Sequence, residues 1–271
     1  MVKSKTQITI DVSWQQTNRF NEKISAYDLN GNIKRLERNG SYSNWATGTI
    51  DKLFYYYNGN QLTAVDDMVS SDNGYDFFDN GNYSYGINLE YGYDANGNVT
   101  MDVNKGIIGI SYDHNNLPID IDFSNDSKLQ YLYDADGNKL RQDVIQSKTL
   151  QKRTDFISNF VLINNYPYWL NFDEGRVILN RGEVTFTETH IKDHLGNTRM
   201  AIGRTDNALV VKQVNSFYPF GMNIKGLTTS YNMPVTKAYP PNEYLYNGKM
   251  FQDELGLDWL DYGARFYGIL M

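Results

Sequence analysis

The sequence predicts an all-β protein in which antiparallel β-hairpins repeat along the chain and join into a curved or spiralling sheet. Three observations support this prediction. A turn motif recurs as YDLNGN from Tyr27, YDANGN from Tyr93 and YDADGN from Tyr133. The segments beside these turns alternate apolar and polar residues, which is the period of a strand. Helical spacing is limited to one short candidate at residues 253–260.

Each copy of the motif has the chemistry of a hairpin turn. An aspartate can cap the backbone amides that follow it, and a glycine adopts positive φ without strain. Asn-Gly and Asp-Gly between alternating segments are strong hairpin signals. We expect the tyrosine ring to lie on the neighbouring hairpin while its hydroxyl reaches water or backbone. The structural turn residues are Tyr27, Asp28, Gly31, Tyr93, Asp94, Gly97, Tyr133, Asp134 and Gly137.

Strand alternation is clearest in four segments, residues 89–93, 99–103, 119–123 and 129–133. Motif copies start at Tyr93, Tyr112 and Tyr133, so they are 19 and then 21 residues apart. A unit of about 20 residues is one hairpin with its turns, and a fixed period is typical of repeat architectures. Because a single hairpin is only marginally stable, the units must join into one continuous sheet.

Composition excludes several classes of protein. The 271 residues are 14% aromatic and 21% charged, which favours a folded chain with a core. The net charge of −7 argues against a nucleic-acid partner. The absence of cysteine excludes disulfides and thiolate metal sites. No apolar stretch is long enough to span a bilayer, and residues 1–16 lack the apolar core of a signal peptide.

Three further motifs follow the repeats in order: DHLGNTR from Asp193, YPFGM from Tyr218, and YLYNGKMFQDELGLDWLDYGARFY from Tyr244. Together with the repeats they resemble the RHS/YD-repeat family, and the last block resembles its RHS-repeat-associated core domain. The resemblance divides the chain into YD-type hairpin repeats at residues 1–190 and a core at residues 191–271, truncated at its C-terminus. The structural core residues are Asp193, Gly196, Asn197, Arg199, Pro219, Gly221, Asn247, Gly248, Gly256, Trp259, Tyr262 and Arg265.

The resemblance implies a shell of spiralling hairpins that encloses a C-terminal cargo, commonly a toxin domain, in a secreted or cell-surface protein. We therefore expect a non-enzymatic shell segment whose partners are a toxin cargo or the rest of the shell. In the family, the aspartates for self-cleavage follow the YGARxY motif. The sequence here ends at Met271, so we carry over neither self-cleavage nor a toxin activity.

The alternative function is a cell-surface module that binds carbohydrate or mediates adhesion. In this interpretation rows of tyrosines stack against sugar rings, whereas the competing interpretation has them filling the interior of the repeats. The tyrosines concerned are Tyr55, Tyr56, Tyr57, Tyr83, Tyr85, Tyr91 and Tyr93.

Metal and catalytic interpretations fail on spacing. Counted from Asp94 or Asp134, glycine falls at position 4 and no glutamate falls at position 12, so neither copy fits an EF-hand loop. His190 and His194 would lie about 13 Å apart on one strand, too far to share an ion. Neighbouring carboxylates such as Asp253 would point away from their partners. We expect no metal, no cofactor and no catalytic residue.

The aromatic end of the core block is expected to pack as a plug, with Arg265 bridging carboxylates or carbonyls. A partial repeat array also leaves sheet edges open, and open edges pair with other chains. The sequence therefore predicts either self-association through these edges or a capping role for the core block.

Overall fold

A computed structural model describes residues 17–42, 46–69, 76–80, 89–180, 182–204, 208–230 and 240–269. These residues are nearly all antiparallel β-sheet, joined by two one-turn 3-10 helices, η1 (Tyr246–Gly248) and η2 (Glu254–Gly256). The all-β prediction is therefore confirmed. The predictions on residues 1–16, Tyr83 and Tyr85 lie outside the described residues. Neither described helix has the length to cross a bilayer.

The strands form three sheets, in each of which sequence neighbours are also sheet neighbours. The first sheet contains β1 (Glu22–Tyr27), β2 (Ile33–Ser41), β3 (Thr47–Asn58) and β4 (Gln61–Asp67). The third contains β19 (Met250–Gln252), β20 (Trp259–Asp261) and β21 (Phe266–Gly268). This order follows from the short connections within the hairpins, because a connection of only a few residues joins antiparallel neighbours.

The second sheet has fourteen strands and runs without a crossover from β5 to β18. Its strands are β5 (Tyr91–Tyr93), β6 (Val99–Asp102), β7 (Ile107–Tyr112), β8 (Pro118–Phe123), β9 (Ser127–Tyr133), β10 (Lys139–Gln146), β11 (Thr149–Ile157), β12 (Phe160–Ile163), β13 (Tyr166–Phe172), β14 (Gly175–Asn180), β15 (Glu183–Lys192), β16 (Thr198–Arg204), β17 (Leu209–Val214) and β18 (Thr229–Ser230). β15 passes through residue 190, where the sequence analysis places a domain boundary, and the boundary stays a prediction.

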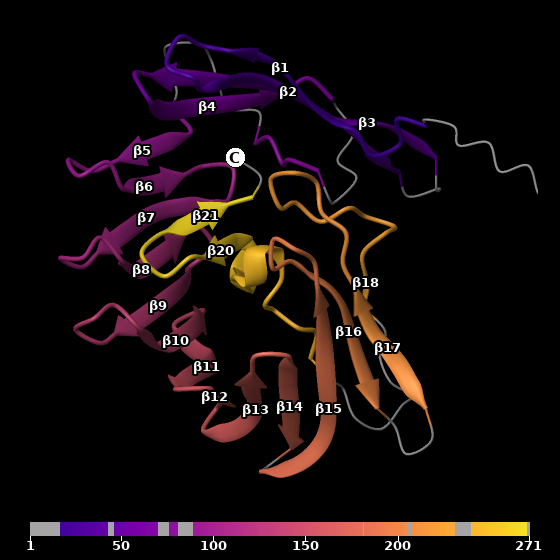
Figure 1. The fold of residues 1–271 in the computed structure, drawn as a ribbon. Coiled ribbons are helices and arrows are strands. Elements are labelled where there is room, and N and C mark those ends of the chain that lie inside the picture. The colour runs from indigo at the N-terminus through magenta and orange to yellow at the C-terminus, as the bar shows by residue number, and fades with distance from the viewer. Residues whose placement is uncertain are drawn as a thin grey trace, which may run out of the picture.

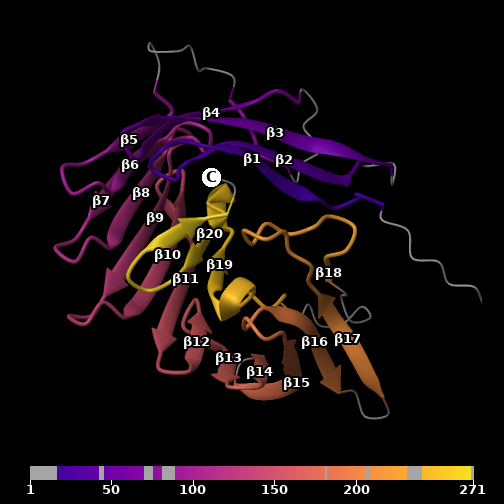
Figure 2. The same cartoon turned by 45° about the horizontal axis from the view of Figure 1, so that its top comes forward.

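The large sheet is strongly curved, and the third sheet lies inside its curve (Figures 1 and 2). The first sheet continues the curve beyond β5, where the Glu90 amide donates to the Thr63 carbonyl and the Val65 amide to the Glu90 carboxylate. At the other end, the Tyr218 hydroxyl donates to the Asn39 carbonyl at 2.7 Å. Tyr218 also packs against Ile50 in a buried apolar cluster. Side chains therefore bridge the two ends of the curve, although the sheets do not close into a barrel.

Every complete YD turn uses the same clamp. In the second copy, Asp94 Oδ1 accepts from the amides of Asn96 and Asn98 at 2.9 and 2.8 Å, and Asp94 Oδ2 accepts from the Asn98 side chain at 2.9 Å. Gly97 follows with φ of +83°. The Asn98 side chain and these amides hold the pKa of Asp94 below its ordinary value. The turn explains why the motif requires aspartate first and asparagine last, and it occupies both carboxylate oxygens that an EF-hand would need.

At three of the described turns, the tyrosine before the turn ties its hairpin to the previous one, as predicted. The hydroxyl of Tyr93 donates to the carbonyl of Leu62 at 2.9 Å, and that of Tyr112 donates to Val99 at 2.6 Å. Tyr133 donates to Pro118 at 3.1 Å. Each acceptor is the first or second residue of the strand that follows the preceding turn. The tyrosine is therefore a link between successive hairpins.

The helix expected at residues 253–260 is wrong. Only Glu254–Gly256 forms a single 3-10 turn, between strands β19 and β20, which pair with each other. Leu255 and Asp258 adopt φ of +57° and +50°, which an α-helix does not permit. The helical spacing arose because Leu257 and Leu260 both point into the core from a tight turn and a strand.

Candidate functional site

The candidate functional site is the surface where the C-terminal segment, residues 240–269, docks on the concave side of the large sheet (Figure 2). Its apolar contribution comes from Leu257 and Trp259, which are 0% and 4% exposed. They share one buried cluster with Ile107, Ile121 and Leu129 of β7, β8 and β9. The predicted plug therefore exists, and it shares a core with the repeats that surround it.

Ion pairs between sheet lysines and segment carboxylates surround this apolar contact. Lys139 Nζ lies 2.7 Å from Asp261 Oδ2, and both side chains are less than 15% exposed. Lys152 pairs with Glu254 at 3.1 Å, and Lys105 lies 3.9 Å from Asp258.

In all three pairs the sheet supplies the cation and the segment supplies the anion. The Lys139–Asp261 pair is well covered and is screened by salt much less than a surface pair, whereas Lys152 and Asp258 are each about one third exposed. The three pairs are complementary in charge across the contact between the C-terminal segment and the sheet.

A fourth charged contact holds the start of the segment. Arg176 is 1% exposed, and its Nε lies 2.6 Å from Glu188, while its Nη2 donates to the carbonyl of Pro240. His190 Nε2 lies 2.9 Å from the same carboxylate. Burial alone would raise the pKa of Glu188, but the hydrogen bond from His190 and the charge of Arg176 outweigh it and lower that pKa.

One partly buried carboxyl at this site has a pKa raised above its ordinary value. Burial raises the pKa of Glu243 to about 7, the charge of Lys152 opposes the rise, and Glu254 adds to it. Burial likewise raises the pKa of Asp253 and of Asp258. The segment therefore gains negative charge as the pH rises, within a contact that has little water to screen it.

The three core motifs, far apart in the sequence, meet around η1. The Asn197 side chain of DHLGNTR accepts from the amide of Asn247 at 2.7 Å. The Tyr246 hydroxyl donates to the carbonyl of Pro219 in YPFGM. A Cβ on Gly221 would lie 2.8 Å from the Tyr246 ring, which explains glycine there. Four of the predicted core residues, Asn197, Pro219, Gly221 and Asn247, therefore lie together around η1.

The remaining predicted core residues divide into two groups. Tyr262 accepts from the Asn247 side chain at 2.9 Å, and Arg199 stacks on Phe217, next to YPFGM. Asp193, Gly196 and Gly248 shape the two turns that hold Asn197 and Asn247, and Gly256 ends η2. Arg265 is exposed in the turn between β20 and β21, and no ion pair joins its side chain to another of the described residues, so its bridging role stays a prediction.

The tyrosine rows do not form an exposed stacking face. Tyr55 and Tyr91 are 3% and 1% exposed and belong to the core between the first sheet and β5. Tyr56, Tyr57 and Tyr93 are partly buried. For the described tyrosines, the interpretation as interior filling is therefore the correct one.

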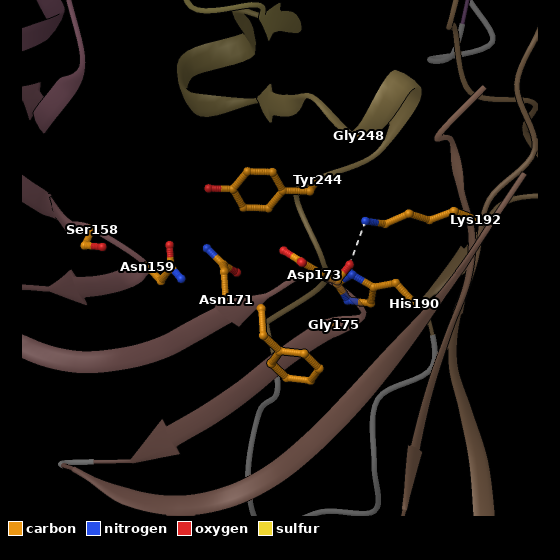
Figure 3. A pocket seen from close by; sticks show the side chains of 10 residues that line it. Ser158, Asn159, Asn171, Asp173, Gly175, His190, Lys192, Tyr244 and Gly248 are labelled. Carbon is orange, nitrogen blue, oxygen red and sulfur yellow. Dashed lines mark hydrogen bonds between the residues drawn. The ribbon is translucent and has the colours of Figure 1, made fainter. Parts of the chain in front are cut away.

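A polar pocket of about 330 Å³ lies where the segment crosses the turn between β13 and β14 (Figure 3). The Tyr244 ring faces Asn159 and Asn171 across it. Lys192 Nζ donates to the carbonyl of Asp173 at 3.0 Å. Lys192 precedes Asp193, so it occupies the tyrosine position of a turn motif, and it also reaches back to a carbonyl of the preceding hairpin, in this case in the turn itself. Among the described residues, no group of three ligands is placed to hold a metal ion.

Sequence reasoning missed the lysines Lys105, Lys139 and Lys152 and the carboxyl of Glu243. Lys139 stands next to a turn, where lysine is ordinarily solvated, and nothing in its neighbours marks it as inward. Its partner is 122 residues further along the chain. Only the curvature of the whole sheet brings the two residues together.

No family model matches the chain, and no curated protein does. Among solved structures, the crystal structure of TcdB2-TccC3-Cdc42 matches over 94% of this chain with a TM-score of 0.57 at 14% identity. The chain shares this fold. It is also similar, at TM-scores of 0.49 and 0.48, to the crystal structure of TcdB2-TccC3 and to the Tc holotoxin pore of Photorhabdus luminescens.

Those two matches have 12% and 11% identity and cover 90% and 93% of this chain. The chain spans only 14% to 18% of the length of the three solved chains. The shared part is therefore the fold of one section of a much longer polypeptide.

Proposed function

We propose that the chain is a non-enzymatic structural segment of an RHS-type shell, in a secreted or cell-surface protein of the RHS/YD-repeat family. Residues 1–190 supply hairpin repeats, and residues 191–271 supply the core. The observation that carries the proposal is the C-terminal segment docked inside its own curved sheet by a shared apolar core and three ion pairs. The fold shared with TcdB2-TccC3-Cdc42 supports it.

The direction of the chain supports a cargo role. Strand β21 lies inside the curve, and the last described residue, Ile269, is 5% exposed. A cargo attached after residue 271 would therefore start on the concave side of the sheet. Its partners would be that cargo, for which the family resemblance favours a toxin domain, and the remainder of the shell.

Protease access at the two ends of the chain tests this proposal. A short peptide carrying a specific cleavage site is attached directly after Met271 in one protein and directly before Met1 in a matched control. If the C-terminal site starts inside the curve, its cleavage requires opening of the docked segment. We expect it to be cut about tenfold more slowly than the control site.

A variant distinguishes protection by the docked segment from differences in how well the protease cuts the two added sites. Lys139→Ala removes one ion pair of the segment and should speed cleavage at the C-terminal site while the N-terminal rate stays the same. Equal cleavage rates at the two ends of the wild-type chain would refute the proposed placement.

The polar pocket favours the carbohydrate alternative at one place. Asn159, Asn171 and Asp173 present amide and carboxylate groups beside the ring of Tyr244, a combination that suits hydroxyl-rich ligands (Figure 3). A glycan array probed with the wild-type chain and with Asn171→Ala tests it. Binding that the substitution abolishes supports a sugar site there, and the absence of wild-type binding removes the alternative.

A further inference from the structure

Tyr27 breaks the rule that links successive hairpins. It precedes a turn whose clamp is complete, because Asp28 accepts from the amides of Asn30 and Asn32 and from the Asn32 side chain. Yet Tyr27 is 58% exposed, and its hydroxyl has no hydrogen-bond partner within the described residues. Its position therefore has the geometry of a linking tyrosine without the hairpin that such a tyrosine would join.

The strand beside it is also an open edge. Within the described chain β1 pairs with β2 alone and stands at the end of the first sheet. On its other side the same hairpin is joined normally, since the Asn32 side chain donates to Asn60 at 3.2 Å in the next turn. The open edge and the exposed tyrosine thus coincide on one side of a hairpin that is otherwise fully integrated.

From this coincidence we infer that edge β1 is a docking site for a further repeat hairpin of a larger shell, whose second strand pairs antiparallel to β1 and offers a backbone carbonyl to Tyr27. The inference rests on the proposed function and adds the edge, the contact and the kind of partner. Tyr93, Tyr112 and Tyr133 set the geometry, because each donates across the corresponding junction at 2.6 to 3.1 Å. The inter-repeat junction therefore continues past β1 with the same chemistry.

Lys192 supports the general form of this junction. It occupies the tyrosine position and donates to the Asp173 carbonyl on the preceding hairpin. A donor that reaches back is therefore satisfied at four described junctions with two different side chains. Tyr27 is a fifth donor of the same kind, aimed at a place where the described chain has no acceptor.

A peptide taken from the chain itself serves as the probe. Residues 107–123 form the hairpin β7–β8, whose Pro118 carbonyl is the natural acceptor of Tyr133. Ile107 and Phe123 are paired at its open end, so a short linker can join them and hold the hairpin closed. The fluorescently labelled cyclic peptide is titrated with the full chain, and anisotropy reports binding.

We expect saturable binding to the wild-type chain and about fivefold weaker binding to Tyr27→Phe, the effect of one net hydrogen bond. Tyr166→Phe is the matched control, because Tyr166 is also 58% exposed but lies away from this edge on β13, and it should bind like the wild type. Equal affinities for wild type and Tyr27→Phe, or no saturable binding, would overturn the inference.

Sedimentation equilibrium of the free chain distinguishes a different occupant. A dimer that Tyr27→Phe weakens would mean that β1 joins two copies of this chain, and the shell hairpin would be excluded. Failure of the peptide to bind leaves the protease protection of the C-terminal site unaffected, so the two proposals fail separately.

Discussion

The backbone amide of Asn247 donates a hydrogen bond to the side chain of Asn197 at 2.7 Å, although 50 residues separate them. Asn197 is simultaneously the closing residue of a turn, donating its amide group to Asp193 at 2.8 Å. One side chain therefore joins the last repeat-like turn to the docked C-terminal segment, and it is 5% exposed.

Replacing Asn197 by alanine should destabilise the protein by about 2–3 kcal/mol, because the Asn247 amide loses its acceptor and the turn loses the hydrogen bond to the Asp193 carboxylate. Urea denaturation followed by tryptophan fluorescence measures the loss. Asn138→Ala is the matched control, since Asn138 closes an exposed turn with the same clamp and its side chain makes no hydrogen bond to another segment among the described residues. Equal losses in the two variants would show that the contact with Asn247 contributes nothing.

Lys139→Ala should cost about 3 kcal/mol, because it leaves the carboxylate of Asp261 largely buried without its cation. The amides of β20 should lose hydrogen-exchange protection in this variant. Lys128→Ala, which removes a pair on the exposed face with Asp122, should change stability by less than about 0.5 kcal/mol. The double variant Lys139→Met with Asp261→Leu should recover much of the loss, and no recovery would contradict the buried-charge explanation.

Stability should fall as the pH rises from about 5 to 8. Burial raises the pKa of Glu243 to about 7 and those of Asp102 and Asp67 to about 6, so the folded chain retains protons that the unfolded chain has released. Their contribution is complete below about pH 4, where the folded and unfolded chains both hold these protons, and is lost as the pH passes through the raised values. The pKa values of Glu188 and Asp193 are lowered, so their contribution to stability is lost only as the pH falls below this range.

Thermal unfolding across this pH range measures the effect, with Tm highest near pH 5. Glu243→Gln removes one of the titrating groups and should flatten the profile by on the order of 2 kcal/mol between its ends. A wild-type Tm that rises from pH 5 to 8 would contradict the assignment of these carboxyls as buried.

Gly203→Ala should destabilise the protein by about 2 kcal/mol or more, because a Cβ at this position would lie 1.4 Å from the ring of Phe186. Gly109→Ala is the control on another strand, where the nearest atom would be 3.9 Å from the new Cβ. It should be neutral or slightly stabilising, since alanine restricts the unfolded chain. Differential scanning fluorimetry compares the two, and similar Tm values would contradict the close packing at β16.

The repeats could be predicted from the sequence because their information is local. The clamp between Asp94 and Asn98, and the link from Tyr112 to Val99, lie within one or two hairpins. Strands β5, β6, β8 and β9 accordingly fall within two residues of the predicted segments. Alternation of side chains and turn chemistry are enough to specify them.

The candidate site could be predicted only in part, because its contacts span the whole chain. The pairing of Lys139 with Asp261 depends on how fourteen strands curve, which no short window encodes. Arg265 shows the opposite case, because it belongs to a conspicuous motif although its side chain is exposed to solvent. The aromatic residues of the core block predicted that the block is buried. They gave no information on which of its charged side chains are buried with it.

Lys192 shows that the residue before a repeat turn can differ in chemistry while the arrangement of the hairpins stays the same. An ammonium and a phenol differ in size, charge and shape, yet both span the distance to a carbonyl on the adjacent ribbon. The position requires only a side chain that is long enough to reach the carbonyl and that carries a hydrogen-bond donor. A sheet of this kind therefore tolerates extensive substitution within its repeat motifs. The chain accordingly shares its fold with TcdB2-TccC3-Cdc42 although only about one residue in seven is the same.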